Sequence, residues 1–221
     1  VLATNAATLT QRCDTADSTH VARLMAYIRT AAPTVGLWHA AGVLADSIMP
    51  RQEAKALARV YAPKAHGACS LHLTCATAPR SSCALFSSVA ALLGGPGQSN
   101  YSAANACLDT LASCRRGCAQ MATSVQWGAW AEVGMAARGA AAARMAVMEA
   151  ASGFDRIGLA QGLGALLAAV QPQAPSTLGV VPVRWDRLLR GGAVAAFLTG
   201  MVVPKTARRL SLIHISEPTR H

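Results

Sequence analysis

The sequence CALFSSVAALLGGPGQSNYSAANACLDTLASC, residues 83–114, decides the fold class. It opens with a short, mostly apolar run typical of a buried strand, and the glycines at residues 94–97 mark a loop. From Ser99 or Asn100, either of which can serve as the N-cap, the pattern predicts a helix to about residue 114. Strand, loop and helix in this order predict one unit of an α/β fold.

The same alternation extends in both directions from this stretch. Further strands are predicted at residues 35–39, 123–127 and 178–183, and helical regions at residues 21–31, 50–74 and 138–170. Because the strands lack alternating polar positions, they indicate a doubly wound parallel sheet with helices on both faces. Ligands bind such sheets beyond the carboxyl ends of the strands, so residues 40–42, 87–88 and 127–130 are candidates for function.

Composition excludes several classes of protein. Of the 221 residues, 52% are hydrophobic and only 14% charged, which predicts a single domain with a sizeable core. The net charge of +10 comes mainly from seventeen arginines scattered along the chain, so we expect no nucleic-acid partner, although an anionic cofactor would be favoured. No apolar run reaches the ~18 residues of a membrane span, so we expect no membrane partner.

Cysteine usage predicts thiols rather than a metal site or disulfides. The seven cysteines form no CxxC motif, and Cys114 and Cys118 have no second ligand pair at a metal-like spacing. We therefore expect no metal and a reducing compartment, cytoplasmic or, as an open alternative, a plastid.

Four residues could carry carbonyl chemistry. Ser88 ends a predicted strand, while Tyr101 and Asn105, four residues apart, share one face of the following helix. A serine hydroxyl and a phenol at one sheet edge could hold a carbonyl oxygen, and the phenol could protonate it. An ammonium nearby stabilises the phenolate, which makes Lys64, one of only three lysines, a candidate.

These residues lie in three of five motifs that resemble the ketoreductase domain of type I polyketide synthases and related fatty acid synthases. The motifs are HAAGVLAD (39–46), APKAHG (62–67), LFSSVA (85–90), GQSNYSAANA (97–106) and WGAWAEVGM (127–135). The resemblance covers about residues 1–203 and implies a Rossmann-like sheet of the short-chain dehydrogenase/reductase superfamily. It also implies NADPH-dependent reduction of a 3-ketoacyl thioester to a 3-hydroxyacyl thioester. The expected partners are an acyl carrier protein with a phosphopantetheine-bound chain and neighbouring synthase domains.

The resemblance assigns roles to the four candidates. Tyr101 becomes the general acid, Ser88 orients the carbonyl, Lys64 partners the phenol and the ribose, and Asn105 supports a proton relay. The wider superfamily has Lys four residues after the Tyr, where this chain has Asn105, and Lys64 matches the lysine that this branch supplies from an earlier helix. The alternative for Asn105 is that it only braces its helix.

The resemblance also implies a cofactor site formed by Asp14, Ala40, Ala41 and Gly42, together with Lys64 and Tyr101. Asp14 could instead cap the next helix, and the small-residue turn could simply allow tight packing. The segment 127–130 lies beneath the nicotinamide in the family, but its tryptophans could equally fill the core.

Three residues lie on the substrate side by the same resemblance: Asp46, Leu93 and Gln98. The sequence Leu44-Ala-Asp46 is similar to the Leu-Asp-Asp loop of B-type ketoreductases, and Leu93 stands where A-type members carry Trp. A B-type, D-configured product is expected, although Ala103 replaces a proline common in that type. Alternatively, Asp46 is a solvated loop acid.

The glycine-rich turn with which the family begins is missing, since the chain contains no G-x-G-x-x-G. We therefore expect an incomplete sheet of order 3-2-1-4-5-6-7 that begins at its third strand and lacks the central strand beside residues 35–39.

Residues 1–203 are expected to form a partial ketoreductase domain and 204–209 a linker. The last twelve residues, 210–221, resemble a translated sequencing adapter. A catalytically silent scaffold module is the alternative function, and a polyketide or a fatty acid product stays open.

Overall fold

The computed structural model describes residue 8 and residues 10–31, 36–75, 82–132, 153–189 and 197–198. In chain order the elements are α1 (Ser18–Ala31), β1 (Gly36–His39), a 3₁₀ turn (Met49–Arg51), α2 (Ala54–Tyr61), a π-helical turn (Ala62–His66), α3 (Gly67–Thr74), β2 (Ser82–Ser88), α4 (Ala90–Leu93), α5 (Ser99–Gly117), β3 (Thr123–Trp127), α7 (Leu159–Ala169), β4 (Thr177–Val180) and α8 (Trp185–Leu188). The alternation of strands and helices predicted from the sequence is therefore confirmed, and we refer to residues 62–66 as the π turn.

The four strands form one parallel sheet in the order β1-β2-β3-β4. Ser88 pairs with Trp127, and Trp127 pairs with Val180, so the carboxyl ends of β2, β3 and β4 lie at the same edge of the sheet. β1 is an outer strand, and no strand within the described ranges pairs with its other side. The expectation that a central strand of the family's sheet, missing from this sequence, belongs at that edge stays a prediction.

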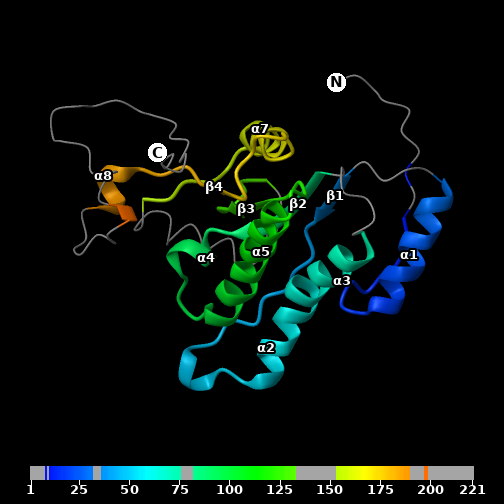
Figure 1. Cartoon of the computed structure of the whole chain (residues 1–221). Coiled ribbons are helices and arrows are strands. Elements are labelled where there is room, and N and C mark those ends of the chain that lie inside the picture. Colours follow the sequence, from blue (N-terminus) through cyan, green and yellow to red (C-terminus); the bar gives the residue numbers. More distant parts are fainter. Residues whose placement is uncertain are drawn as a thin grey trace.

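Helices cover both faces of the sheet (Figure 1). On one face, Cys83 and Leu85 of β2 pack with Leu108 of α5, and α1 and α3 lie alongside. On the other face, Val125 and Trp127 of β3 pack with the helix α7. Every residue of β3 is buried, and its polar side chains Ser124 and Gln126 donate hydrogen bonds to Asp109 of α5.

The helical region predicted at residues 50–74 is a succession of four elements rather than one helix. A 3₁₀ turn, α2, the π turn and α3 follow one another there. Pro50 and Pro63 each occupy the first positions of a new element, because proline lacks the N–H that a continuing helix needs. The π turn carries Lys64 and could not be foreseen from apolar spacing.

The predicted cap of α5 is wrong. The N-cap is Gln98, without a side-chain cap hydrogen bond, and Ser99 and Asn100 lie in the first turn. Asn100 is used elsewhere: its Nδ2 donates to the carbonyl oxygen of Ala45 at 2.8 Å, across a gap of 55 residues. The helix also continues to Gly117, three residues beyond its predicted end.

The last strand is shorter than predicted. β4 ends at Val180 because Pro182 cannot donate to a sheet ladder, and Val183 instead forms an isolated bridge with Phe154. Several predictions lie outside the described residues: position 35, residues 138–152 of the predicted helix, the linker 204–209 and the tail 210–221.

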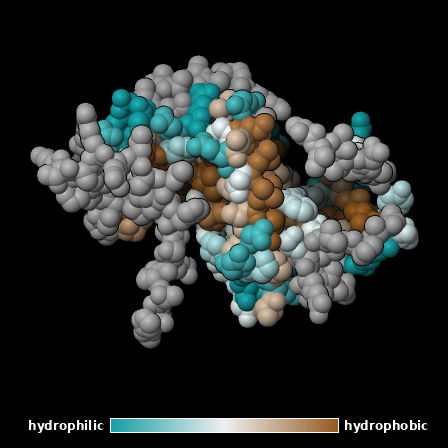
Figure 2. All heavy atoms as spheres, turned by 90° about the horizontal axis from the view of Figure 1, so that it is seen from above, coloured by the Kyte–Doolittle hydropathy of each residue, from teal (hydrophilic) through white to brown (hydrophobic). Residues whose placement is uncertain are grey.

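The outer side of α7 is apolar. Leu159, Leu163 and Leu167, spaced four residues apart, are each at least half exposed. Seen from above, hydrophobic atoms gather where α7 lies (Figure 2). Among the helices that the structure describes, none is long and apolar enough to cross a membrane.

Candidate active site

Tyr101 and Asn105 lie on the buried face of α5. Their exposed fractions are 8% and 0%. Asn105 Nδ2 donates to the carbonyl oxygen of Tyr101 at 2.8 Å, and Asn105 Oδ1 is buried without a hydrogen-bond partner within the described part of the chain. The face predicted from their spacing is thus the one turned to the sheet, and it holds a buried acceptor with unused capacity.

Ser88 is the last residue of β2 and is half-buried. Its Oγ accepts a hydrogen bond from the amide of Ala90 at 3.2 Å, which fixes the side chain where the strand turns into α4. A hydrogen bond from Ser88 to the Tyr101 phenol contributes to the pKa of that phenol. The structure therefore places Ser88 near the Tyr101 phenol.

Lys64 enters the site from the π turn. Its side chain is 3% exposed, its Nζ donates to the carbonyl oxygen of Phe86 at 2.9 Å, and the same Nζ lies 5.4 Å from the centre of the Tyr101 ring. Lys64 and Tyr101 are thus neighbours although they are far apart in sequence. An ammonium has three donors, so the bond to Phe86 leaves capacity for further partners.

Burial controls the acidity of both groups. Burial lowers the pKa of Lys64 to about 8, opposed by the carboxylate of Asp109. Burial raises the pKa of the Tyr101 phenol, opposed by hydrogen bonds from Asn105 and Ser88. The lysine therefore titrates close to neutral pH, as groups at functional sites often do.

Two residues near Lys64 were not predicted from the sequence. Asp109 accepts hydrogen bonds from Ser124 Oγ at 2.6 Å and from Gln126 Nε2 at 2.8 Å, so β3 fixes its carboxylate. It stands four residues after Asn105 on α5, and this spacing was the available signal. The other is His39, the first residue of the HAAGVLAD motif, whose Nε2 lies 3.3 Å from the carbonyl oxygen of Lys64.

The substrate-side residues come from two loops that are joined by hydrogen bonds. Gln98 Nε2 donates to Asp46 Oδ2 at 3.2 Å, and the amide of Ser47 donates to the carbonyl oxygen of Gly97 at 2.9 Å. Gly97 has a φ of +74°, a conformation that favours glycine. Asp46 is exposed, and Leu93 lies half-buried at the end of α4. The structure thus brings Asp46 and Gln98 together.

The predicted cofactor residues are held less tightly. Asp14 is exposed and accepts a hydrogen bond from the amide of Ala16, whereas Asp17 receives the amides at the start of α1. The cap function considered for Asp14 therefore belongs to Asp17. Ala40, Ala41 and Gly42 follow β1 directly.

Gly42 lies against the catalytic candidate Lys64. A Cβ at position 42 would stand 2.9 Å from Lys64 Cε, which is too close without movement of the lysine. The small side chains after β1 therefore make room for Lys64, whatever else they contact.

The tryptophans considered for the nicotinamide are packed together: Trp127 is 7% exposed and its ring centre lies 4.9 Å from that of Trp130.

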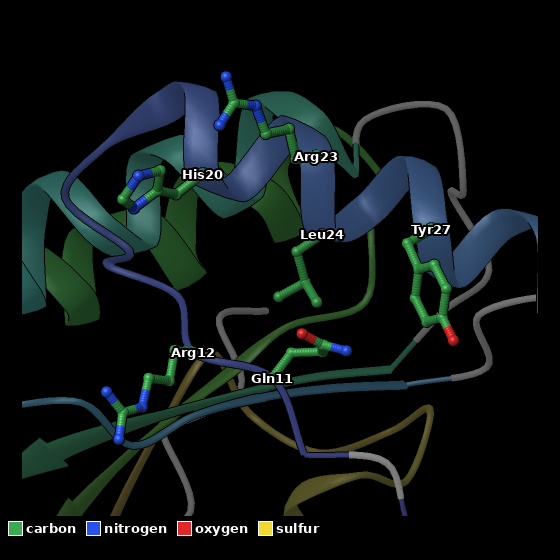
Figure 3. Close-up of a pocket in the computed structure, with 6 residues that line it drawn as sticks. All are labelled: Gln11, Arg12, His20, Arg23, Leu24 and Tyr27. Atoms are coloured by element: carbon green, nitrogen blue, oxygen red, sulfur yellow. The ribbon is translucent and has the colours of Figure 1, made fainter.

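A cavity of about 370 Å³ lies between α1 and the segment that precedes it (Figure 3). Its lining is Gln11, Arg12, His20, Arg23, Leu24 and Tyr27. None of the predicted site residues lines it, and Figure 3 shows Arg23 pointing away from it. In the described ranges, no group of three His, Cys, Asp or Glu residues could hold a metal ion.

Comparisons with known proteins show which family the chain belongs to. Residues 3–132 match the family described as KR domain. The chain is 38% identical over 194 residues to the polyketide synthase GfsA of Streptomyces halstedii, covering 86% of this chain and 3% of that protein. It is 45% identical over 107 residues to the phthioceranic/hydroxyphthioceranic acid synthase of Mycobacterium tuberculosis (strain ATCC 25618 / H37Rv), covering 48% and 5%.

Solved structures show the same likeness. An A-type ketoreductase from a modular polyketide synthase matches with a TM-score of 0.73 and 32% identity, over 80% of this chain and 37% of that one. The first ketoreductase of the tylosin polyketide synthase matches with a TM-score of 0.68 and 34% identity, over the same shares. The chain therefore spans little more than a third of these ketoreductases and a few per cent of the synthases.

Proposed function

The chain belongs to the KR domain family, the ketoreductases of polyketide synthases, and we propose that it carries the catalytic residues of an NADPH-dependent reductase. The proposed substrate is a 3-ketoacyl thioester on an acyl carrier protein, and the product is the 3-hydroxyacyl thioester. The observation that carries the proposal is the buried contact between Lys64 and Tyr101, with the Lys64 Nζ 5.4 Å from the phenol ring.

In the proposed reaction, Tyr101 gives its phenolic proton to the ketone oxygen, and Ser88 holds that oxygen by a hydrogen bond. NADPH supplies the hydride for the carbonyl carbon. Burial raises the pKa of the Tyr101 phenol and so disfavours its charged form. In the proposed reaction the nearby ammonium of Lys64 stabilises the charge left on Tyr101. A ketone, a hydride and a proton then give the alcohol, and the phenolate must regain one proton.

Asn105 supports that return of the proton. Its buried Oδ1 has no hydrogen-bond partner among the described residues, and such an atom is usually satisfied by ordered water. A water held there can connect Tyr101 and Lys64 to solvent. A side chain that only braced α5 would need just the bond from its Nδ2 to the Tyr101 carbonyl oxygen.

The residues fit a dinucleotide only in part. The unused donors of Lys64 suit a ribose hydroxyl, and Ala40, Ala41 and Gly42 carry too little side chain to obstruct an approaching nucleotide. The exposed carboxylate of Asp14 would accept a hydrogen bond from the adenine. The choice of NADPH over NADH rests on the family alone.

Stereochemistry and partners are proposed from the substrate side. Asp46 and Gln98, joined at 3.2 Å, and Leu93 in place of tryptophan support a B-type product. Because an A-type ketoreductase is among the similar structures, similarity of fold carries no stereochemical argument.

The acyl carrier protein and neighbouring synthase domains are the proposed partners. A reducing compartment is proposed because all seven cysteines are free.

The test uses the natural polypeptide that carries this sequence, supplied with NADPH and a 3-ketoacyl thioester. We expect NADPH consumption matched by formation of the 3-hydroxyacyl thioester. Tyr101→Phe should reduce turnover by roughly 10²–10⁴-fold, because it removes the proton donor. Tyr61→Phe, a change at a half-buried tyrosine on α2, should retain turnover. No product from the unaltered protein would instead favour the silent scaffold module.

A further inference from the structure

The π turn that carries Lys64 is an unusual element. It spans Ala62–His66 between two ordinary helices, and the amide of Gly67 bonds to the carbonyl oxygens of Ala62 and Lys64. π-helical turns are rare and often lie at functional sites, because the extra residue redirects a side chain. What holds this turn in place therefore also determines where the lysine points.

A buried histidine contacts the turn from the sheet. His39, the last residue of β1, is 3% exposed, and its Nε2 lies 3.3 Å from the carbonyl oxygen of Lys64. The pKa of His39 is lowered, mainly by burial and also by the charge of Lys64, and hydrogen bonds to the backbone of Lys64 and Pro63 oppose this shift. The ring is thus neutral near pH 7, and a bond to a carbonyl requires the proton on Nε2. The proposed reaction does not otherwise use His39.

A second side chain reaches the turn from the segment before α1. Thr15 Oγ1 lies 3.5 Å from the carbonyl oxygen of Pro63. Gly67 permits both approaches, because a Cβ there would stand 2.6 Å from Thr15 Oγ1 and 3.4 Å from His39 Cε1. Two carbonyl groups of the turn therefore face side chains from outside the helix.

We propose that His39 is a positioning residue: by donating a hydrogen bond to the Lys64 carbonyl oxygen, it holds the π turn so that the lysine side chain reaches Phe86 and Tyr101. The catalytic meaning of this role rests on the proposed function. The geometry itself can be tested without turnover, because the environment of Lys64 is measurable in the absence of NADPH and substrate.

The experiment measures the rate at which an amine-reactive reagent acylates Lys64 at a series of pH values. After digestion, the extent of acylation is read from the peptide that contains Lys64, and the pH at which the rate is half its maximum is the midpoint. The natural polypeptide is used without ligands. We expect a midpoint near the pKa of about 8. His39→Leu should raise the midpoint by about one pH unit or more, because the lysine loses its buried place. His39→Gln, whose amide nitrogen can replace Nε2 as donor, should keep it.

Other charges do not produce this pattern. The groups that face Lys64 are Asp109, the Tyr101 ring and His39 itself. Asp109 and Tyr101 are unchanged in both variants, and His39 is neutral where Lys64 titrates. A shift in His39→Leu that His39→Gln reverses thus reports the hydrogen bond.

An unchanged midpoint in His39→Leu, or equal shifts in both variants, would overturn the proposal. If His39→Leu does not fold, Thr15→Val gives the second test, with a smaller upward shift expected and no shift contradicting the proposal. If His39→Leu loses turnover while the pH midpoint of Lys64 acylation does not move, the positioning role is refuted but the proposed reductase function is not. A moved midpoint in a protein that never reduces the thioester would refute the reductase and leave the geometric role of His39.

Discussion

Two parts of the predicted site differ in how the protein holds them. Lys64, Tyr101 and Asn105 are each less than a tenth exposed and are fixed by bonds to backbone carbonyls or by ring contact. Asp14 and Asp46 are exposed on loops. Buried groups have their positions and pKa values set by the fold, whereas exposed ones gain their geometry when a ligand binds. Changes in the buried part should therefore affect chemistry, and changes in the exposed part affect recognition.

After that of Tyr101→Phe, the largest effect is expected from Lys64→Met. Turnover should fall by roughly 10²–10³-fold, because the Tyr101 phenolate loses its ammonium partner. Lys55→Met, at an exposed lysine of α2, is the matched control and should retain turnover. Comparable losses in both variants would show that the effect is not specific to the site.

The same substitution should stabilise the domain. Burial lowers the pKa of Lys64 from 10.5 to about 8, so the folded state binds fewer protons than the unfolded state between these values. The cost, about 3 kcal/mol, is fully present below pH 8 and disappears as pH rises toward 10.5. Pulse proteolysis in urea should thus show Lys64→Met more stable than the unaltered protein at pH 7. A less stable variant at that pH would contradict the assigned burial cost.

Gly42→Ala should have the next largest effect. The new Cβ would stand 2.9 Å from Lys64 Cε, so the lysine must shift and turnover should fall about tenfold. Gly164→Ala is the control, because a Cβ at that helical glycine meets nothing within 4 Å. Full turnover in Gly42→Ala would mean that Lys64 tolerates displacement.

A smaller change is expected from Asp109→Asn. Removing the carboxylate lowers the pKa of Lys64 further, because that charge favours the ammonium. The alkaline limb of the turnover profile should therefore move to lower pH by a few tenths of a unit, in a pH–rate measurement. Glu53→Gln, at an exposed acid before α2, should leave the profile in place.

The smallest effect on rate is expected from Asp46→Ala. Asp46 is exposed and its contact with Gln98 is a single hydrogen bond of 3.2 Å, so turnover should change by no more than about threefold. The ratio of 3-hydroxy stereoisomers should change instead, which chiral chromatography of the products measures. A rate loss as large as that of Lys64→Met would remove the contrast between the two parts of the site.

The sheet, and the place of part of the candidate site within it, could be predicted from the sequence for physical reasons. Helices cover both faces of the sheet, and β3 matches its predicted limits, residues 123–127, although Thr123, Ser124 and Gln126 are polar. Tyr101 and Asn105 could be placed on one face because they belong to a single helix. Lys64 was a candidate because an ammonium stabilises a phenolate, and its contact with these residues was expected from the resemblance to the family.

What the sequence did not reveal depends on contacts between distant segments. The π turn has no periodic signal, and the bond from Asn100 to Ala45 replaced an expected helix cap. Asp109 and His39 were missed because an aspartate on a helix and a histidine at the end of a strand are ordinary until their partners are known. Their partners, Ser124, Gln126 and the Lys64 carbonyl oxygen, come from other elements.

The most direct test of the account is the pH dependence of kcat/KM for NADPH, measured for the unaltered protein and for Lys64→Arg. This parameter reports groups that titrate in the free protein. The unaltered protein should lose activity as pH rises through about 8, because Lys64 gives up its proton there. Lys64→Arg should be slower, and that decline should be absent because arginine stays charged. The same decline in Lys64→Arg would contradict the claim that the buried lysine supports Tyr101.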